Sequence, residues 1–442
     1  MEKKIPKRFA FALMNSLKSG VVPRTGLGYI AVGRKDEIDA LLSDIDIVED
    51  GGASFRLIVG EYGSGKSFLL QTIRAYAMDK GFAVIDADLS PERRFCGTGG
   101  QGLATYRELI RNFSVKAQPD GSALELVLEK WVLGIRTSVM QASGLSPETD
   151  SFSQAVTLKI YEEISSLKSL VGGFDFAFVI AKYHEAYQSG DDTTKSNSLK
   201  WLRGEYATKT EAKSDLGVNG IIADDNWYEY IKLFAEFTVK AGYKGLLMLI
   251  DELVHISRSI SNGITRQYNY EKLLTIYNDA LQGKASHLGI IMGGTPKCVE
   301  DTRRGIFSYE ALKSRLEDGR FYADGMKNLM SPIIRLAPLN YEELLVLTEK
   351  LADIHSGLFD YKRTVSTEDA AAFLKAELGR IGAAERITPR EVIKDFISVL
   401  DIAKQNPSLS LKDIIGGEGF EFSKTEAEEN ESVSDGFTDF SL

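Results

Sequence analysis

The stretch FRLIVGEYGSGKSFLLQ, residues 55–71, decides the fold. It opens with a short apolar run that predicts a buried strand and closes with a helical pattern. Between them, residues 60–67 match the Walker A pattern GxxxxGK[ST]. A strand, a glycine-rich turn and a helix give this pattern the context that it needs. The backbone N–H groups of such a loop can wrap phosphates, and the helix N-terminus adds the positive end of its dipole.

The side chains of the loop predict a nucleotide triphosphate with Mg²⁺. Lys66 would place its charge at the β- and γ-phosphates, and Ser67 would offer its hydroxyl to the metal. The glycines let phosphate approach the backbone where a Cβ would interfere. A chance glycine-rich turn is the alternative interpretation. The candidate nucleotide contacts in this loop are Gly60, Tyr62, Gly63, Ser64, Gly65, Lys66, Ser67 and Phe68.

A second apolar run, KGLLMLIDEL at residues 244–253, ends in Asp251 and Glu252. A carboxylate at the end of a strand can hold the Mg²⁺ shell, and the adjacent one can activate the attacking water. We therefore assign Asp251 to the metal and Glu252 to the general base. A carboxylate pair that merely caps the next helix is the alternative.

Three weaker strand-like runs lie at residues 82–89, 287–296 and 332–339, and helical patterns separate them. This alternation predicts an α/β fold with a buried parallel sheet covered by helices on both faces. Thr295, in the ending of the run at residues 287–296, is a candidate to hold the lytic water or the γ-phosphate, although a turn residue would look the same. For Asp86 and Asp88, near the end of the run at residues 82–89, we favour a structural role.

Arginines outside the loop are candidates to contact the γ-phosphate. Arg315, in YEALKSRLEDGR, would act as a finger in a neighbouring subunit, with Arg303 and Arg304 as competitors. Arg390, in ITPREV, would close onto the phosphates of its own subunit. Each has a solvated surface arginine as its alternative.

Composition excludes several classes of protein. The 442 residues carry a net charge of −10, which argues against coating DNA through bulk charge, but the acidic tail from residue 418 contributes −7 of it. Two separated cysteines, Cys96 and Cys298, predict reduced thiols in a cytoplasmic protein, and four scattered histidines argue against a zinc site. No apolar run reaches the roughly 18 residues of a membrane span.

The order GRKDEI, GEYGSGKS, LLMLIDE, GGTP, SRLE and TPRE resembles AAA+ ATPases of the initiator-like group, which includes origin-recognition and loader proteins. More specifically, KRFAFALMNSLKSGVVPRTGLGYIAVGRKDEI, GEYGSGKSFLLQ, DADLSPERRF and GQGLATYRELIRN resemble the BrxD family of ATP-binding proteins in bacterial BREX phage-defence systems. The resemblance implies an ATPase that works with a partner helicase on DNA or a DNA-bound complex.

The resemblance also assigns roles to residues. It implies Lys66 and Ser67 as Walker A residues, with Asp251 and Glu252 as Walker B. It further implies Thr295 as sensor 1, Arg315 as the arginine finger and Arg390 as sensor 2, while backbone from Val32 and Gly33 would shape the adenine pocket. Proteins of the initiator-like group usually add a winged-helix DNA-binding domain after the lid, whereas this chain runs into its acidic tail.

We expect five regions along the chain. Apolar residues recur at helical spacing after the strand-like run at residues 82–89. Three helices with start signals at Asn340, Ser366 and Thr388 follow the run at residues 332–339. DDTTKSNS, residues 191–198, is expected to be a solvated loop. The regions are a first half of the ATPase core (1–117), a helical insertion (118–240), a second half of the core (241–338), a helical lid (339–415) and a disordered acidic tail (416–442).

Three functions fit these features. The first is an ATP-hydrolysing switch or loader that assembles into a homo-oligomer on ATP binding and works with a helicase. The second is an ATP-binding scaffold or signalling protein with negligible hydrolysis. A small-molecule kinase is the third, and the acid pair Asp251–Glu252 weighs against it. Direct DNA contact could use Lys3, Lys4, Lys7 and Arg8, or Arg93 and Arg94, although ordinary solvated charges are the favoured interpretation.

Overall fold

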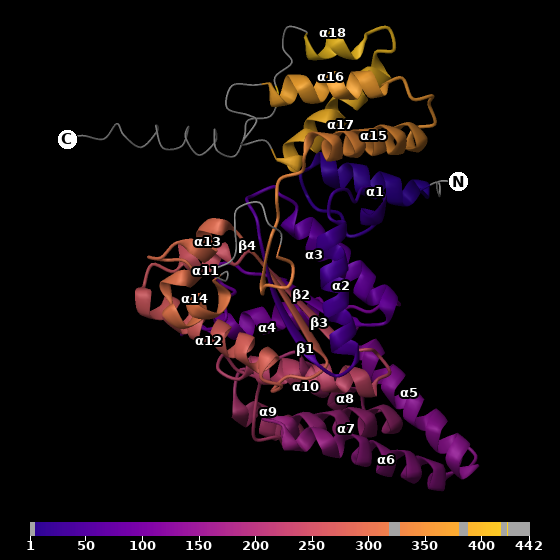
Figure 1. Cartoon of the computed structure of the whole chain (residues 1–442). Coiled ribbons are helices and arrows are strands. Elements are labelled where there is room, and N and C mark those ends of the chain that lie inside the picture. The colour runs from indigo at the N-terminus through magenta and orange to yellow at the C-terminus, as the bar shows by residue number, and fades with distance from the viewer. Residues whose placement is uncertain (1–4, 318–327, 380–387, 417–421, 423–442) are drawn as a thin grey trace, which may run out of the picture. The chain divides into compact units, whose positions relative to one another are not determined.

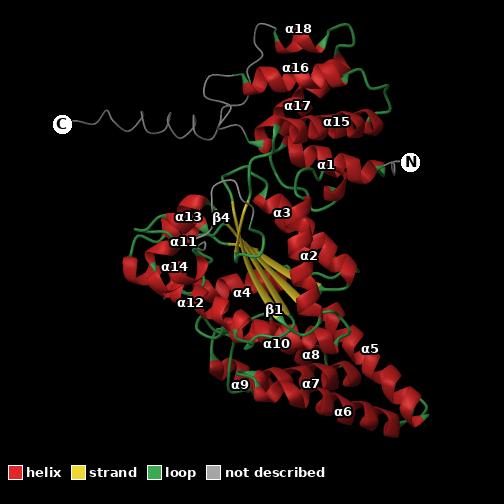
Figure 2. Cartoon of the chain, viewed as in Figure 1, coloured by secondary structure: helices red, strands yellow, loops and turns green. Residues whose placement is uncertain are grey.

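The computed structural model describes residues 5–317, 328–379, 388–416 and 422 (Figure 1). Five strands form one sheet in the order β2-β3-β4-β1-β5, drawn in yellow in Figure 2. β2 pairs in parallel with β3, β3 with β4, and β4 with β1. The strand bounds are β1 Ala53–Val59, β2 Ala83–Asp88, β3 Leu246–Asp251, β4 Leu288–Gly294 and β5 Ile333–Arg335.

The sheet is buried, as its apolar sequence requires. Every residue of β3 and of β4 is buried, and so are the last five residues of β1. Helices cover it: α4 (Gln101–Arg111) packs on β2, α10 (Trp227–Lys240) on β3 and α12 (Gly263–Leu281) on β1. The predicted α/β class and all five predicted strands are confirmed. Because parallel strands end at one edge, the polar residues that follow them gather there.

Helices fill the chain between β2 and β3. Their core includes edge-to-face aromatic pairs, such as Trp131 with Phe237 at 5.3 Å between ring centroids and Phe176 with Phe234 at 5.0 Å. Besides α4 and α10, these elements are α5 Leu124–Ser143, α6 Asp150–Ser165, the 3-10 helix η2 Ser166–Ser169, α7 Gly173–Ser189, α8 Asp192–Leu202 and α9 Lys209–Leu216.

The expectation of a solvated loop at residues 191–198 is wrong. Asp191 Oδ1 accepts hydrogen bonds from the backbone of Thr193 (3.1 Å) and Thr194 (3.0 Å), so it caps α8. Trp201 on that helix is buried. The polar run is therefore the first part of a helix, exposed at its start and increasingly buried towards the apolar end that anchors it, which its composition alone does not reveal.

Shorter elements follow β3 and β4. The helix α11 (Val254–Ser259) begins just after Asp251 and Glu252, and α13 (Pro296–Glu300) begins just after Thr295. The 3-10 helix η3 (Ile306–Ser308) and α14 (Glu310–Leu316) come next along the chain.

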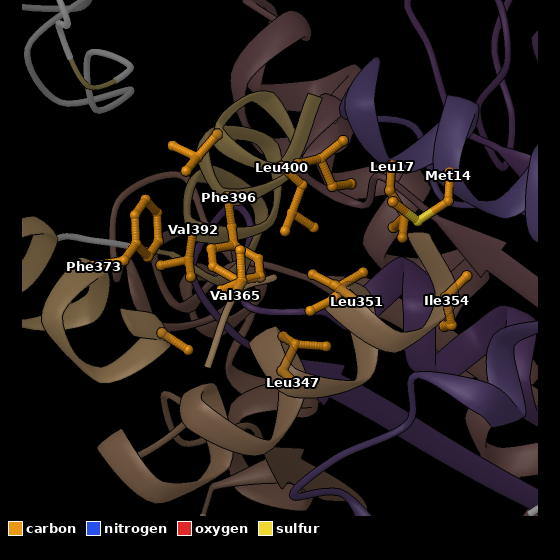
Figure 3. Close-up of a cluster of buried hydrophobic side chains, with 14 of the residues drawn as sticks. Met14, Leu17, Leu347, Leu351, Ile354, Val365, Phe373, Val392, Phe396 and Leu400 are labelled. Carbon is orange, nitrogen blue, oxygen red and sulfur yellow. The ribbon is translucent and has the colours of Figure 1, made fainter. Parts of the chain in front are cut away.

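The helices near the two ends of the chain share a hydrophobic core, shown in Figure 3. Met14 and Leu17 of the N-terminal helix pack into a cluster with Leu351 and Phe396. Capping boxes at Asn340, Ser366, Thr388 and Ser410 begin the four C-terminal helices, which confirms the three predicted helix starts. The helices are α1 Lys7–Lys18, α15 Tyr341–Leu358, α16 Thr367–Leu378, α17 Pro389–Gln405 and α18 Leu411–Ile415.

The chain divides into two compact units. The first combines Met1–Ile38, Gly60–Thr72 and Arg335–Leu442, and the second combines Asp39–Val59 and Ile73–Ile334. The five functional regions expected above stay a prediction. Among the residues described, no helix is both long enough and apolar enough to cross a bilayer.

Candidate functional site

The phosphate-loop motif lies where β1 gives way to α3 (Lys66–Lys80). Gly63 and Gly65 have φ angles of +73° and +96°, a region that residues with a Cβ enter only with strain. A Cβ on Gly65 would meet no atom within 4 Å, so the backbone there faces open space. The loop therefore has the backbone conformation for which its glycines were predicted.

Lys66 is held over this loop. Its Nζ donates to the carbonyl oxygens of Gly60 and Glu61, both at 2.8 Å, and lies 5.5 Å from the ring centroid of Tyr62. The Ser64 hydroxyl is buried and has no hydrogen-bond partner among the residues described. A buried hydroxyl of this kind is a ready donor for an anion, since leaving it without a partner costs free energy.

The segment before α2 (Lys35–Glu49) also contacts the loop. The Arg34 guanidinium donates to the Ser64 carbonyl oxygen at 3.0 Å and lies 4.0 Å from the Glu37 carboxylate. Burial lowers the pKa of Arg34, while the charges of Glu37 and Glu343 oppose this shift. The second oxygen of Glu37 is buried without a partner among the described residues. This segment thus contacts the loop through Arg34 and places a buried carboxylate oxygen of Glu37 nearby.

Two predicted base contacts, Val32 and Gly33, precede this arginine. Val32 is partly buried against the helical core of Figure 3. Gly33 has a φ of +67°, and a Cβ there would lie 2.5 Å from Oε1 of Glu343. Glycine suits both this left-handed backbone and this close approach, which places the segment beside α15. Phe68, the last predicted loop contact, also packs on that core.

The first turn of α17 lies against the phosphate loop, within the first compact unit. A Cβ on Gly63 would lie 2.4 Å from Oγ1 of Thr388, so the N-cap of α17 touches the phosphate loop. Arg390 lies close to Gly20, with its Cδ 3.9 Å from where a Cβ of that glycine would be. The sequence did not indicate the contacts of Arg34 and Thr388 with the loop, because nothing in their local pattern encodes a tertiary neighbour.

In the second unit, carboxylates gather at the ends of β2 and β3. Asp88 and Asp251 are opposite each other in the strand register, and Asp251 is 8% exposed. Glu252 has a φ of +60° and donates its N–H to Oδ1 of Asp251 at 2.8 Å. Glutamate rarely adopts this conformation, and strained backbone of this kind concentrates at functional sites.

The charges of this cluster repel one another. Desolvation raises the pKa of Asp88 to about 6, the charges of Asp251, Asp86 and Glu252 add to the shift, and Arg93 opposes it. Asp86 is committed elsewhere, since its Oδ1 accepts from Nε of Arg74 at 3.1 Å. The structural role favoured for Asp86 agrees with this contact, whereas Asp88 belongs to the acidic cluster.

The remaining candidates have local partners. The Thr295 hydroxyl accepts from the backbone of Cys298 at 3.3 Å and caps α13. Arg315 donates to the carbonyl oxygen of Ala311 in its own helix at 2.7 Å. Arg304 donates to the carbonyl oxygens of Ser257, Arg258 and Ile260 at the end of α11. The roles of Thr295, Arg315 and Arg390 in catalysis stay predictions.

Two groups were proposed to contact DNA. Of the N-terminal group, Lys3 and Lys4 lie outside the described residues, and Lys7 pairs with Asp360. Arg93 donates to the carbonyl oxygen of Asp88 at 2.8 Å. The tail beyond residue 422 also lies outside the described residues.

The residues present fit a nucleotide triphosphate. The phosphate loop offers left-handed glycines, a lysine ammonium and the unpaired Ser64 hydroxyl. Among the described residues, no group of three or more His, Cys, Asp or Glu side chains could hold a metal by itself. Mg²⁺ bound with ATP needs only one or two protein oxygens, since phosphates and waters complete its shell. Ser67 and Asp251 stay the predicted ligands.

Comparison with known families agrees with this chemistry. Residues 5–418 match the model of the family described as BREX system ATP-binding protein BrxC/D. The match covers nearly the whole chain, so the protein belongs to this family of ATP-binding proteins from the BREX anti-phage system. The search of curated proteins found no match.

Proposed function

We propose that this member of the BrxC/D family is a Mg²⁺-dependent ATPase of the AAA+ type that acts as a switch or loader in phage defence. The observation that carries the proposal is the phosphate loop at residues 60–67, with its left-handed glycines and its lysine, directly after a buried parallel strand. The five-strand parallel sheet is consistent with a P-loop fold.

Each catalytic residue has a proposed task. Lys66 neutralises the β- and γ-phosphates, while Ser67 and Asp251 hold Mg²⁺. Glu252 takes a proton from the attacking water. Thr295 orients the water or the γ-phosphate. The strained backbone of Glu252 supports its functional role.

The assembly is part of the proposal. Arg315 completes the site of a neighbouring subunit, and Arg390 acts within its own subunit. The lid and the helical insertion convert nucleotide state into contacts with a helicase partner, and through it or directly with DNA. Exposed apolar side chains on the insertion, such as Leu133, Leu158 and Phe174, support a partner there.

A second function remains a specific rival. An ATP-binding scaffold would use every binding residue named here and release no phosphate. The capping bond of Thr295 and the helical bond of Arg315 favour this rival, because both side chains already have structural partners.

Phosphate release and solution mass separate the two. We expect the full chain with ATP and Mg²⁺ to release phosphate, to stop when Mg²⁺ is chelated, and to increase in mass by light scattering when ATP binds. The Arg315→Ala variant should bind ATP but turn it over slowly. ATP binding with no phosphate release, alone or with nucleic acid and the helicase, would favour the scaffold. A monomer under every condition would remove the role of Arg315 in trans.

A further inference from the structure

A basic groove lies in the second unit, away from the phosphate loop along the chain. It encloses about 520 Å³ between α11, α13 and the loop that follows α13. These helices pack together, as Figure 1 shows beside the labels α11 and α13. The groove is lined by Ser257, Arg258, Lys297, Asp301, Arg303 and Arg304.

Positive charge dominates this lining. Arg258, Lys297, Arg303 and Arg304 are all exposed. Within the described part of the chain, no carboxylate oxygen lies within 4 Å of the side-chain nitrogens of Lys297, Arg303 or Arg304. Residues 253–270, which include α11, contain no Asp or Glu. In a chain with a net charge of −10, this groove is a local exception.

The single acidic residue of the lining organises the loop. Asp301 Oδ1 accepts from the backbone N–H groups of Arg303 at 2.8 Å and Arg304 at 3.3 Å. The hydrogen bond from Arg303 is the main cause that lowers the pKa of Asp301, and the bond from Arg304 and the charges of Arg303 and Lys297 act in the same direction. The Asp301 carboxylate therefore stabilises the turn that carries Arg303 and Arg304.

Arg304 fastens the groove to α11. Its guanidinium donates to the carbonyl oxygens of Ser257, Arg258 and Ile260, at 3.2, 3.1 and 3.2 Å. Arg266 also donates to the Ile260 oxygen, at 2.9 Å. Arg304 thus has a framework role, which leaves the exposed side chains of Lys297 and Arg303 to meet a ligand.

We propose that this groove binds the phosphodiester backbone of a nucleic acid. All six lining residues are polar or charged, so the groove lacks the apolar and aromatic anchors on which protein partners rely. Interfaces with nucleic acids are polar and strongly positive, and most of their hydrogen bonds go to phosphate and sugar. Contacts of this kind give affinity without sequence preference.

The position of the groove can couple ligand binding to ATP hydrolysis. This step rests on the proposed ATPase function. α11 follows the acid pair Asp251–Glu252, and α13 is capped by Thr295. Both helices that line the groove therefore continue from strand ends that carry proposed catalytic residues. Nucleic acid bound across α11 and α13 can shift these strand ends and so change the rate of hydrolysis.

Charge removal tests the groove. The double variant Lys297→Ala/Arg303→Ala is compared with Lys209→Ala/Lys213→Ala, which removes two exposed lysines from α9. Fluorescence anisotropy of the full chain measures binding to a fluorescein-labelled 30-nucleotide oligo-dT and to a 30-base-pair duplex, over a range of salt. We expect the groove variant to lose about tenfold or more in affinity. The slope of log K against log salt should fall by about 1.4 for oligo-dT or about 1.8 for duplex.

A charge-conserving variant controls for folding. Lys297→Arg/Arg303→Lys should restore most of the binding, and the α9 variant should bind as wild type does. The probe that loses more affinity identifies the form of nucleic acid. Equal binding by wild type and groove variant, equal losses in the α9 variant, or no binding to either probe would overturn the proposal. A polyglutamate peptide that binds the groove more tightly than both probes would also overturn it.

The ATPase proposal can fail separately. Lys66→Ala should still bind the probe that wild type binds, because the groove needs no nucleotide. Stimulation of phosphate release by nucleic acid should decrease in the single variant Lys297→Ala while its basal release remains, because Lys297 has no proposed role in the ATPase site. Groove binding with no phosphate release under any condition would leave the groove established and remove the ATPase.

Discussion

The phosphate loop and the acidic strand ends have different proposed tasks, nucleotide binding and hydrolysis, and they use different chemical groups for them. We propose that the loop binds phosphate through its backbone conformation, with two glycines at positive φ, and through two side chains, Lys66 held by carbonyl oxygens and Ser64 with its buried hydroxyl. The strand ends act through side-chain charge, with Asp88, Asp251 and Glu252 crowded together and Glu252 itself at a φ of +60°. The proposed binding thus depends mainly on backbone conformation, whereas the proposed hydrolysis depends on a few charged side chains.

Removing the proposed base should separate the two regions most strongly. We expect Glu252→Gln to lower phosphate release by roughly 10²–10⁴-fold, because proton abstraction is lost, and to leave ATP affinity within about threefold. The control Glu92→Gln removes a nearby charge from a carboxylate that bonds Ser90. Release at the wild-type rate from the Glu252 variant would remove that residue from the mechanism.

Removing the loop lysine should affect binding instead. Lys66→Ala loses charge-assisted hydrogen bonds to phosphate, so we expect ATP to bind about 100-fold more weakly by calorimetry. Lys80→Ala, at the other end of the same helix, serves as its control, since that side chain pairs with Asp46. The comparison between the two regions fails if affinity for ATP is unchanged in the Lys66 variant.

The two left-handed glycines of the loop should differ from each other. Both substitutions place an alanine at a positive φ. The new Cβ at position 63 would also clash with Thr388, whereas the new Cβ at position 65 would meet no atom within 4 Å. We expect urea denaturation without nucleotide to give losses in unfolding free energy of about 2–3 kcal/mol for Gly63→Ala and about 1 kcal/mol for Gly65→Ala. ATP affinity should fall in the Gly65 variant, whose Cβ would occupy the open space. Equal stability losses would deny the contact with Thr388.

The acidic cluster should respond to pH in a way that the loop does not. The pKa of Asp88 rises from its usual 3.8 to about 6, so ionisation of Asp88 disfavours the folded state. This cost develops as pH rises from 3.8 towards 6 and is complete above that value. Asp88→Asn should therefore stabilise the chain by roughly 1 kcal/mol at pH 8, a small effect because solvent screens this exposed group. Denaturation midpoints of wild type and Asp88→Asn that are equal to each other at every pH from 5 to 8 would contradict this.

The sequence predicted the framework well because the framework is local. All five strands and the helix starts at Asn340, Ser366 and Thr388 appear as expected, since apolar runs and capping residues act on their own neighbours. The polar run at residues 191–198 misled because Trp201, further along, anchors its helix.

The site was predictable in its motifs but not in its contacts. The left-handed conformation of Gly63 and Gly65 could be predicted from spacing alone, because backbone conformation follows from residue type there, while the nucleotide contacts of the loop stay predictions. The contact of Arg34 with Ser64 and that of Thr388 with Gly63 join segments that are distant in sequence. The strand order that places β4 between β1 and β3 is likewise a property of the folded sheet. The groove arginines Arg303 and Arg304 were noticed in the sequence only as possible fingers.

The most direct test of the central claim is a crystal structure of the full chain with a non-hydrolysable ATP analogue and Mg²⁺. We predict that Lys66 and the loop N–H groups contact the phosphates, that Ser67 and Asp251 share the metal, and that the Glu252 carboxylate faces the γ-phosphate through one water. A loop without nucleotide, or a nucleotide in the loop with Asp251 and Glu252 turned away from it, would contradict the account.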